Sequence, residues 1–318
     1  MDTPLTMRLE PLFRAYYSRP ARAGVNALIR ILLSLDSGEQ CLLAGVGATQ
    51  RKVSHIVEAV THHSVYFGQR PKTPLNKYEF KVYSQNGEDG ILLYLVSKIG
   101  ATTRTLVEFG CGSGRECNSA NLLRNFGWNG LLMDIDDMNV RDALEYYEDL
   151  VRRRRRIAIA KHRINAENIN QVLTEHGMRG EIDLLSIDID GNDYWVWKAV
   201  NQITPRIVVI EYNASLGYDE AITVKYDPSF DRLGKSSSGL YHGASLQAMK
   251  ELGHSKGYAL LGCDSSGANA FFVRRELLTD ALREVSVVDG YYPNARRSRT
   301  LTPDQQQDII RRLDFEHI

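Results

Sequence analysis

The stretch that most constrains the fold is a short strand pattern followed at once by a turn with three glycines. Residues 105–108 (Thr-Leu-Val-Glu) are rich in strand formers, and Gly110, Gly112 and Gly114 take alternate positions after them. A polar segment then leads into the helical pattern of residues 120–126. Glycine is needed where the backbone takes a positive φ or passes close to a ligand, and the first N–H groups of a helix can bind one. The sequence therefore predicts a ligand-binding strand, turn and helix.

The side chains near this turn separate two classes of cofactor. The dinucleotide fingerprint G-x-G-x-x-G would need its third glycine where Arg115 stands. Glu108, two residues before the first glycine, suits a cationic ammonium group. Asp134 ends the next strand pattern, where it can accept hydrogen bonds from ribose hydroxyls, with Asp136 as the other candidate. E-x-G-x-G-x-G resembles motif I of the class I S-adenosylmethionine (SAM) methyltransferases, so SAM is favoured over a nicotinamide cofactor or a purely structural turn.

Composition excludes several other classes of protein. The chain has 318 residues, 43% hydrophobic and 25% charged, which is typical of a globular protein of one large or two modest domains. Its formal net charge is zero, which gives no electrostatic case for binding nucleic acid or a membrane surface. No apolar run reaches the roughly 18 residues of a membrane span, and the start lacks a secretory leader pattern. The 4 cysteines lack metal-type spacing, so we expect reduced thiols in a cytoplasmic protein.

Three stretches resemble a particular family. They are S-Q-N-G-E-D-G (84–90), V-E-F-G-C-G-S-G (107–114) and N-S-A-N-L-L-R-N-F-G-W-N-G (118–130). Together they resemble the FkbM-type branch of the SAM-dependent methyltransferases, over roughly residues 78–280. The resemblance implies an α/β fold with a seven-stranded Rossmann-like sheet. It implies SAM contacts from Gln85, Glu108, Gly110, Gly112, Asn118 and Asp134, and in this fold adenine contacts from Ala166 and Glu167.

Carboxylates gather where two later strand patterns end. The fourth pattern runs into Asp188 and Asp190, and the fifth ends at Glu211, two residues before Asn213. Strand residues alternate in direction, so Asp188 and Asp190 point the same way, at the sheet edge where open α/β sheets bind ligands. Oxygen ligands suit Mg²⁺ or Mn²⁺, and the arrangement resembles that of the metal-dependent O-methyltransferases of this fold. That resemblance implies metal ligation by Asp190, Glu211 and Asn213, with Asp188 as base or further ligand. Alternatively, these acids bind substrate hydroxyls or cap the next helix.

The stretch after the fifth strand is polar and long. Residues 214–243 predict a lid or a substrate wall, with disorder as the competing interpretation. His242, at the end of this stretch, is a candidate general base, although a histidine in a loop is more often only hydrogen-bonded. Two strand patterns, 258–264 and 270–274, are joined by a short turn, which predicts an antiparallel hairpin. Such a hairpin is typical of a class I methyltransferase sheet and not of a dinucleotide dehydrogenase.

We therefore predict three regions and one favoured function. Residues 1–77 form a helical extension (a cap, a lid or a homo-oligomer contact), 78–285 the methyltransferase domain and 286–318 a helical tail. The arginine run 152–156 is interpreted as a solvated helix end rather than a polyanion site. The favoured function is cytoplasmic SAM-dependent O-methylation of a sugar hydroxyl, on a glycan or glycosylated natural product, with metal assistance. The alternatives are a nicotinamide-dependent oxidoreductase on a nucleotide sugar and a non-catalytic SAM-fold partner subunit.

Overall fold

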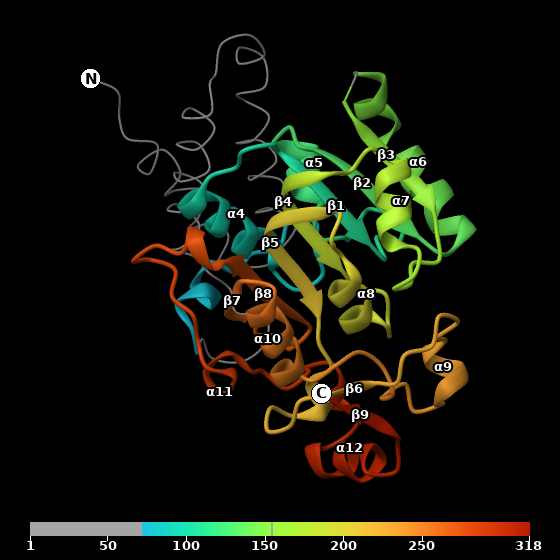
Figure 1. The fold of residues 1–318 in the computed structure, drawn as a ribbon, viewed down its shortest axis with the longest axis vertical. Helices are drawn as coiled ribbons and strands as arrows, with labels where there is room; N and C mark the ends of the chain where they lie inside the picture. Colours follow the sequence, from blue (N-terminus) through green and yellow to red (C-terminus); the bar gives the residue numbers. More distant parts are fainter. Residues whose placement is uncertain (1–71, 154) are drawn as a thin grey trace, which may run out of the picture.

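The centre of the protein is a seven-stranded sheet (Figure 1). The computed structural model describes residues 72–153 and 155–318. The strands of the sheet are β1 (Thr105–Phe109), β2 (Asn129–Asp134), β3 (Ile157–Lys161), β4 (Gly180–Ile187), β5 (Ile203–Glu211), β7 (Tyr258–Cys263) and β8 (Asn269–Arg274). Their order is β3-β2-β1-β4-β5-β8-β7, parallel except that β8 runs antiparallel to both neighbours. The predicted Rossmann-like sheet with a terminal antiparallel hairpin is confirmed.

Helices cover both faces of this sheet. They are α4 (Glu88–Ile99), α5 (Ala120–Asn125), α6 (Asp137–Arg152), α7 (Ile169–Glu175), α8 (Asp193–Ala199) and α10 (Leu246–Ser255). Successive residues of β1 enter opposite cores because strand side chains alternate in direction. Leu106 joins the core under α4, α5 and α6, whereas Val107 and Phe109 join the core under α7, α8 and α10. The result is a three-layer α/β/α arrangement.

The order of the strands reverses direction between β1 and β4. From β1 the chain moves outward through β2 and β3, then returns to β4 on the other side of β1. The connections after β1 and β4 therefore leave in opposite directions, and this divergence is where open α/β sheets bind ligands. The glycine turn follows β1, and the acids predicted from the sequence follow β4 and β5. The topology thus brings the two sequence signals to one place.

The polar stretch 214–243 folds together with the C-terminal segment. It contains η2 (Ala214–Leu216), β6 (Ile222–Val224) and α9 (Arg232–Lys235), while the C-terminal segment contains α11 (Val287–Gly290), η4 (Arg297–Arg299), α12 (Pro303–Ile310) and β9 (Phe315–His317). β6 and β9 pair antiparallel in a second, two-stranded sheet, below the main sheet in Figure 1. The predicted final helix is confirmed as α12, but the strand β9 and its partner were not predicted.

Some sequence predictions fall outside the described residues. These are the helical extension up to residue 71, its role in a homo-oligomer, and Arg154 within the arginine run. In the part of the chain that the structure does describe, no helix is both long and apolar enough to cross a bilayer.

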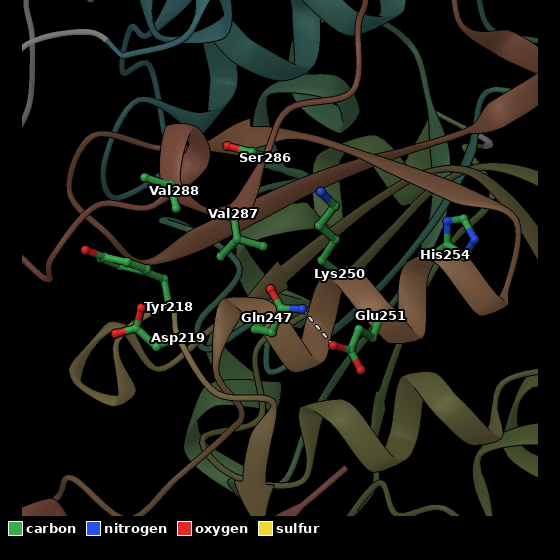
Figure 2. Close-up of a pocket in the computed structure, with 9 residues that line it drawn as sticks. All are labelled: Tyr218, Asp219, Gln247, Lys250, Glu251, His254, Ser286, Val287 and Val288. Carbon is green, nitrogen blue, oxygen red and sulfur yellow. Dashed lines mark hydrogen bonds between the residues drawn. The ribbon is translucent and has the colours of Figure 1, made fainter.

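A shallow depression lies on the outer side of α10 and α11 (Figure 2). Its volume is about 630 Å³, and it is lined by Tyr218, Asp219, Gln247, Lys250, Glu251, His254, Ser286, Val287 and Val288. None of the predicted site residues lines it. We therefore look for the site at the carboxyl edge of the sheet and not in this depression.

Asp183, in β4, is a buried carboxylate that fixes the approach to β1. It is 1% exposed and accepts hydrogen bonds from the N–H groups of Thr102, Thr103 and Arg104 at 2.9, 2.8 and 2.6 Å. We expect Asp183→Ala to lower the free energy of unfolding by about 3–5 kcal/mol, because it leaves the buried guanidinium of Arg206, 3.3 Å from Asp183, and three backbone N–H groups without their carboxylate partner. Chemical denaturation measures this. Asp142→Ala, at an exposed position of α6, should stay within about 0.5 kcal/mol of wild type, and equal losses in both variants would contradict the assignment.

Candidate functional site

The three glycines of the turn have different structural roles. Gly110, Gly112 and Gly114 have φ values of 74°, 54° and 70°, which L-residues rarely adopt. A Cβ on Gly110 would lie 1.6 Å from the carbonyl oxygen of Asp188, and one on Gly114 would lie 2.8 Å from the Tyr147 ring. A Cβ on Gly112 would have no atom within 4 Å. Gly110 and Gly114 therefore let the turn pack closely, whereas Gly112 presents its backbone to open space that a ligand can enter.

Glu108 ties β1 to the start of α5. Its carboxylate is 3% exposed and accepts from the N–H groups of Asn118 and Ser119 at 2.9 and 3.0 Å, and also from the hydroxyl of Ser119. The side-chain amide of Asn118 donates to the hydroxyl of Ser186 at 3.1 Å. Burial raises the pKa of Glu108, although its hydrogen bonds oppose this. The structure thus places Glu108 and Asn118 in the support of the glycine turn, and direct contact with SAM stays a prediction for both.

Asp134 lies against the glycine turn, and Asp136 does not. Asp134 accepts from the N–H of Gly112 at 2.8 Å and from the side-chain amide of Asn139 at 3.1 Å. Asp136 instead caps α6 by accepting from the N–H of Asn139 at 3.0 Å and from that of Met138 at 2.8 Å. Because Asp136 is committed to the helix cap, Asp134 is the better candidate for the ribose contact.

The remaining predicted cofactor residues lie on two separate segments. Gln85 is an exposed residue three positions before α4. The loop after β3 contacts the 214–243 stretch, since the N–H of Ala166 donates to the hydroxyl of Tyr226 at 3.1 Å, and that hydroxyl donates to Glu167. Contacts of Gln85, Ala166 and Glu167 with SAM stay predictions.

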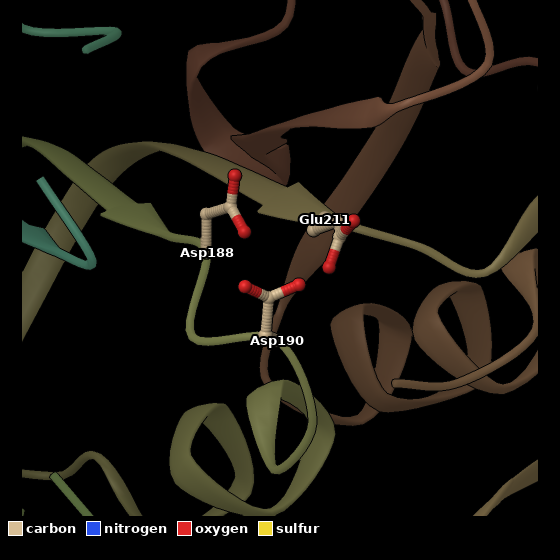
Figure 3. Close-up of side chains that lie close together, drawn as sticks. All are labelled: Asp188, Asp190 and Glu211. Atoms are coloured by element: carbon tan, nitrogen blue, oxygen red, sulfur yellow. The ribbon is translucent and has the colours of Figure 1, made fainter. Parts of the chain in front are cut away.

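Three carboxylates meet at the carboxyl edge of the sheet. Asp188 directly follows β4, Asp190 comes two residues later with a φ of 58°, and Glu211 is the last residue of β5. Each offers an oxygen within 4.8 Å of the other two, and Figure 3 shows the carboxylates turned toward one common space. Within residues 72–153 and 155–318, no other group of three acids, histidines or cysteines has this spacing.

The electrostatics of this acid cluster (Asp188, Asp190 and Glu211) favour a cation. Burial raises the pKa of Asp188 well above its usual value, and the charges of Glu211, Asp193 and Asp190 raise it further. Burial also raises the pKa of Glu211, against the lowering effect of Arg232 and then Arg297. Carboxylates this close repel one another when ionised, so a bound cation would stabilise the ionised form of all three.

Sequence reasoning missed the two arginines beside the acid cluster. Arg232, in α9, donates a hydrogen bond to Asp190. Arg297, in η4, donates to the side-chain oxygen of Asn213 at 3.0 Å and to Nε2 of His242 at 2.5 Å. No motif marks either residue; Arg232 lies between β6 and α10, and Arg297 lies between α11 and α12.

Two predicted residues have other contacts in the structure. Asn213 is fully buried, and its amide donates to the carbonyl oxygens of Leu240 and His242 at 2.8 and 2.9 Å while its oxygen accepts from Arg297. Because its oxygen accepts from Arg297, Asn213 does not contribute a free oxygen to the three carboxylates, and metal ligation by Asn213 stays a prediction. His242 is also fully buried, and burial, Arg297 and Arg232 hold its pKa well below the usual range. It lies beside Glu211, with Nδ1 3.5 Å from Oε2 of that residue.

The comparison with protein families decides the classification. The family described as "Methyltransferase FkbM domain" matches residues 36–256. The chain belongs to the FkbM methyltransferase family. The family resemblance of the sequence motifs is thereby confirmed, and the match includes the glycine turn and the acid cluster. No curated protein sequence matches this FkbM chain.

Several solved structures are similar to this FkbM protein. Magnesium protoporphyrin IX methyltransferase (ChlM) from Synechocystis PCC 6803, with bound SAM, is 11% identical, covering 59% of this chain and 77% of its own, with a TM-score of 0.39. An O-methyltransferase from Bacillus cereus in complex with SAH is 16% identical, covering 77% and 97%, with a TM-score of 0.37. The N-terminal domain of EvdMO1, in the presence of SAH and D-fucose, is 12% identical, covering 73% and 97%, with a TM-score of 0.39. SAM, SAH and D-fucose are named for those structures and not for this protein.

Proposed function

We propose that this FkbM protein transfers the methyl group of SAM to a hydroxyl oxygen, with Mg²⁺ or Mn²⁺ held by the acid cluster. One observation carries the proposal: the acid cluster begins in direct contact with the glycine turn. The N–H of Asp188 donates to the carbonyl oxygen of Phe109 at 3.1 Å, and Gly110 packs on the carbonyl group of Asp188. A donor bound at the turn and an acceptor bound at the acids would be adjacent, as transfer between them requires.

The glycine turn fits a nucleoside cofactor with a charged amino-acid tail. Gly112 leaves its backbone open, and Asp134 lies directly behind that residue at the end of β2. A ribose placed over Gly112 would have a carboxylate within reach of its hydroxyls. Support for SAM itself comes from the methyltransferase family and from the glutamate and three-glycine pattern of residues 108–114.

The acid cluster fits a divalent cation. Each of the three acids offers an oxygen within 4.8 Å of the other two, and carboxylates this close repel one another when ionised unless a cation lies between them. Three carboxylates supply the hard oxygen ligands that Mg²⁺ and Mn²⁺ prefer. The assignment follows the positions of the side chains: Asp190 and Glu211 hold the cation, and Asp188 lies between them and the glycine turn.

The cofactor, the cation and the residues of the site would have different roles in the reaction. When bound, SAM supplies a reactive methyl group, and a divalent cation lowers the pKa of a hydroxyl beside it. Asp188 accepts the proton of the acceptor hydroxyl, because it is the member of the acid cluster whose backbone contacts the glycine turn, where SAM would bind. Arg232 covers the outer side of Asp190 through its hydrogen bond.

The acceptor we propose is a sugar hydroxyl on a glycan or a glycosylated natural product. The 214–243 stretch carries polar side chains suited to hydroxyl-rich ligands, including Tyr226, Asp227 and Tyr241. These side chains pair with one another or with neighbours, since Asp227 pairs with Lys235 at 2.6 Å. We place the acceptor here because the stretch covers the acids through α9.

Calorimetry tests the cofactor and the cation. We expect micromolar SAM binding to wild type, lost or weakened more than about tenfold in Glu108→Ala, because that variant releases the start of α5 from the glycine turn. Mn²⁺ should bind wild type, and a mixture of glycan precursors incubated with SAM and Mn²⁺ should gain 14-dalton adducts by mass spectrometry. The absence of SAM binding would contradict the proposal, and adducts on nitrogen or carbon alone would contradict the acceptor.

Arg232 gives a separate test of the cation site. Its guanidinium is a positive charge hydrogen-bonded to Asp190, so it competes with any cation for that carboxylate. We expect Arg232→Gln to tighten Mn²⁺ binding severalfold, measured by electron paramagnetic resonance of free Mn²⁺. Lys225→Gln removes one positive charge from the same stretch, at an exposed position paired with Asp314, and should leave the affinity within twofold of wild type. Weaker binding in Arg232→Gln would place the cation elsewhere.

A further inference from the structure

Two features of the structure are candidates for a further role: the depression beside α10 and α11, and the contacts that link Arg297, His242 and Glu211. The depression beside α10 and α11 holds no buried unpartnered polar group, among the described residues, that would mark a ligand. The contacts from Arg297 through His242 to Glu211, in contrast, end on the acid cluster and include two buried atoms without partners. We propose that Arg297 and His242 are positioning residues that hold the Glu211 carboxylate in the cation site, so that the C-terminal segment completes that site. This inference rests on the proposed function.

The contact with Arg297 fixes the proton on His242. The guanidinium of Arg297 lies 2.5 Å from Nε2 of His242. A guanidinium can only donate, so Nε2 must accept and carries no proton. The ring is then neutral with its proton on Nδ1, the nitrogen that faces Glu211. Because Arg297 can only donate, the direction of both contacts is set: Arg297 donates to Nε2 of His242, and the Nδ1–H of His242 points to Glu211.

The second contact joins a buried donor to a buried acceptor. Nδ1 of His242 and Oε2 of Glu211 are 3.5 Å apart, and neither has a hydrogen-bond partner among residues 72–153 and 155–318. Each buried polar atom without a partner is unfavourable, and a shift of a few tenths of an ångström would pair the two. The N–H of His242 thus holds one oxygen of Glu211, and the other stays available to the cluster.

In this arrangement His242 acts as a positioning residue instead of the general base predicted from the sequence. The side chain is fully buried, Nε2 is taken by Arg297, and Nδ1 faces a carboxylate. Neither ring nitrogen can receive a proton from an acceptor bound at the acid cluster. Arg297 instead fixes the orientation of the ring, and the ring fixes the orientation of the Glu211 carboxylate. Residues hydrogen-bonded to metal ligands commonly orient those ligands in this way.

The C-terminal segment is held firmly enough to supply Arg297. The N–H of Arg297 donates to the side chain of Asn294 at 3.0 Å, and the side chain of Gln306 accepts from the hydroxyl of Ser215 at 2.6 Å. β9 adds a strand to β6 in the same region. Arg297 also donates to Asn213, so one guanidinium connects the C-terminal segment to both the end of β5 and His242.

Charge and positioning predict opposite signs for an Arg297 variant. Removing a positive charge near three carboxylates should strengthen cation binding if charge alone matters, as we expect for Arg232→Gln. If Arg297 positions Glu211 through His242, Arg297→Gln should weaken Mn²⁺ binding about 10–100-fold. Arg297→Lys, which keeps the charge and loses the two-pronged geometry, should weaken it as well. Arg299→Gln, an exposed arginine of the same 3-10 helix, is the matched control and should change nothing.

The experiment measures Mn²⁺ affinity, SAM affinity and the state of His242 in full-length protein. We expect Arg297→Gln and His242→Ala each to weaken Mn²⁺ binding, with SAM affinity within twofold of wild type, and the double variant to be no weaker than the worse single one. Nitrogen NMR should show the Nδ1–H tautomer in wild type, with the His242 signal assigned by its loss in His242→Ala. That tautomer should not persist in Arg297→Gln.

The outcomes separate this inference from the proposed function. If wild type binds Mn²⁺ and Arg297→Gln binds it equally or more tightly, the positioning role is wrong while the cation site stands. If His242 carries its proton on Nε2 or on both nitrogens, the contact chain is wrong whatever the metal does. If wild type binds no Mn²⁺, the cation assignment fails and the inference fails with it. Should Arg297→Gln not fold, Arg297→Lys and His242→Ala decide by the same measurements.

Discussion

Gly110→Ala should abolish SAM binding and destabilise the protein by more than about 4 kcal/mol, well outside the range of ordinary point variants. The added methyl would lie 1.6 Å from the carbonyl oxygen of Asp188, and 2.7 Å from its carbonyl carbon, which are backbone atoms of the first turn after β4. A rotamer change cannot relieve a collision with backbone, so β1 and β4 would have to separate at the site. Thermal denaturation and calorimetric SAM titration measure the two losses.

Gly112→Ala is the matched control for this prediction. Its φ of 54° is nearly as unfavourable for alanine as the 74° of Gly110, but its methyl would meet no protein atom within 4 Å. We therefore expect a destabilisation of about 1–2 kcal/mol from backbone strain alone. The methyl would still enter the open space over the turn, so SAM affinity should fall more than about tenfold. Equal destabilisation by both variants would show that strain, and not the contact between β1 and β4, governs Gly110.

Individual strands and the terminal hairpin could be predicted from local patterns, whereas the seven-stranded sheet was implied by the family resemblance. The strand predicted at 105–108 is β1, and the hairpin predicted at 258–274 is β7 and β8. These predictions succeed because buried parallel strands are continuous apolar runs, and a short turn between two strands forces them to be antiparallel neighbours. The convergence of Asp188 and Glu211 followed from the same logic, since each ends a strand at one edge of one sheet.

The sequence did not predict the segments that surround the acid cluster. The segment after residue 286 was interpreted as a helical tail, yet it delivers Arg297 to His242. The signal is absent because β6 and β9 are each three residues long and more than ninety positions apart in the chain. Propensity and periodicity cannot identify such short strands. The hydrogen bonds of Asn213 with Leu240 and Arg297 could not be predicted for the same reason, because both partners come from these segments.

Glu211→Gln should lower the methyl-transfer rate by about 10²–10⁴-fold and weaken Mn²⁺ binding, with SAM affinity nearly unchanged. The substitution keeps the shape of the side chain and still lets its oxygen accept from His242, but it removes the negative charge and replaces the oxygen that faces the cluster with an NH2 group, which cannot bind a cation. Single-turnover assays over a range of Mn²⁺ concentrations measure the effect. Recovery of the full rate at saturating Mn²⁺ would limit Glu211 to cation binding. Glu145→Gln, on the exposed side of α6, is the control and should match wild type.

The same variant should be more stable than wild type when no cation is present. Glu211 adds a buried carboxylate to a cluster that already holds Asp188 and Asp190, and its charge raises the pKa of Asp188. Neutralising it removes that repulsion, which we expect to raise the free energy of unfolding by about 1 kcal/mol in metal-free protein. A residue retained for packing would show the reverse, with stability and activity lost together. Loss of stability in Glu211→Gln, with Mn²⁺ affinity intact, would therefore make Glu211 a structural residue and remove the acid cluster from the chemistry.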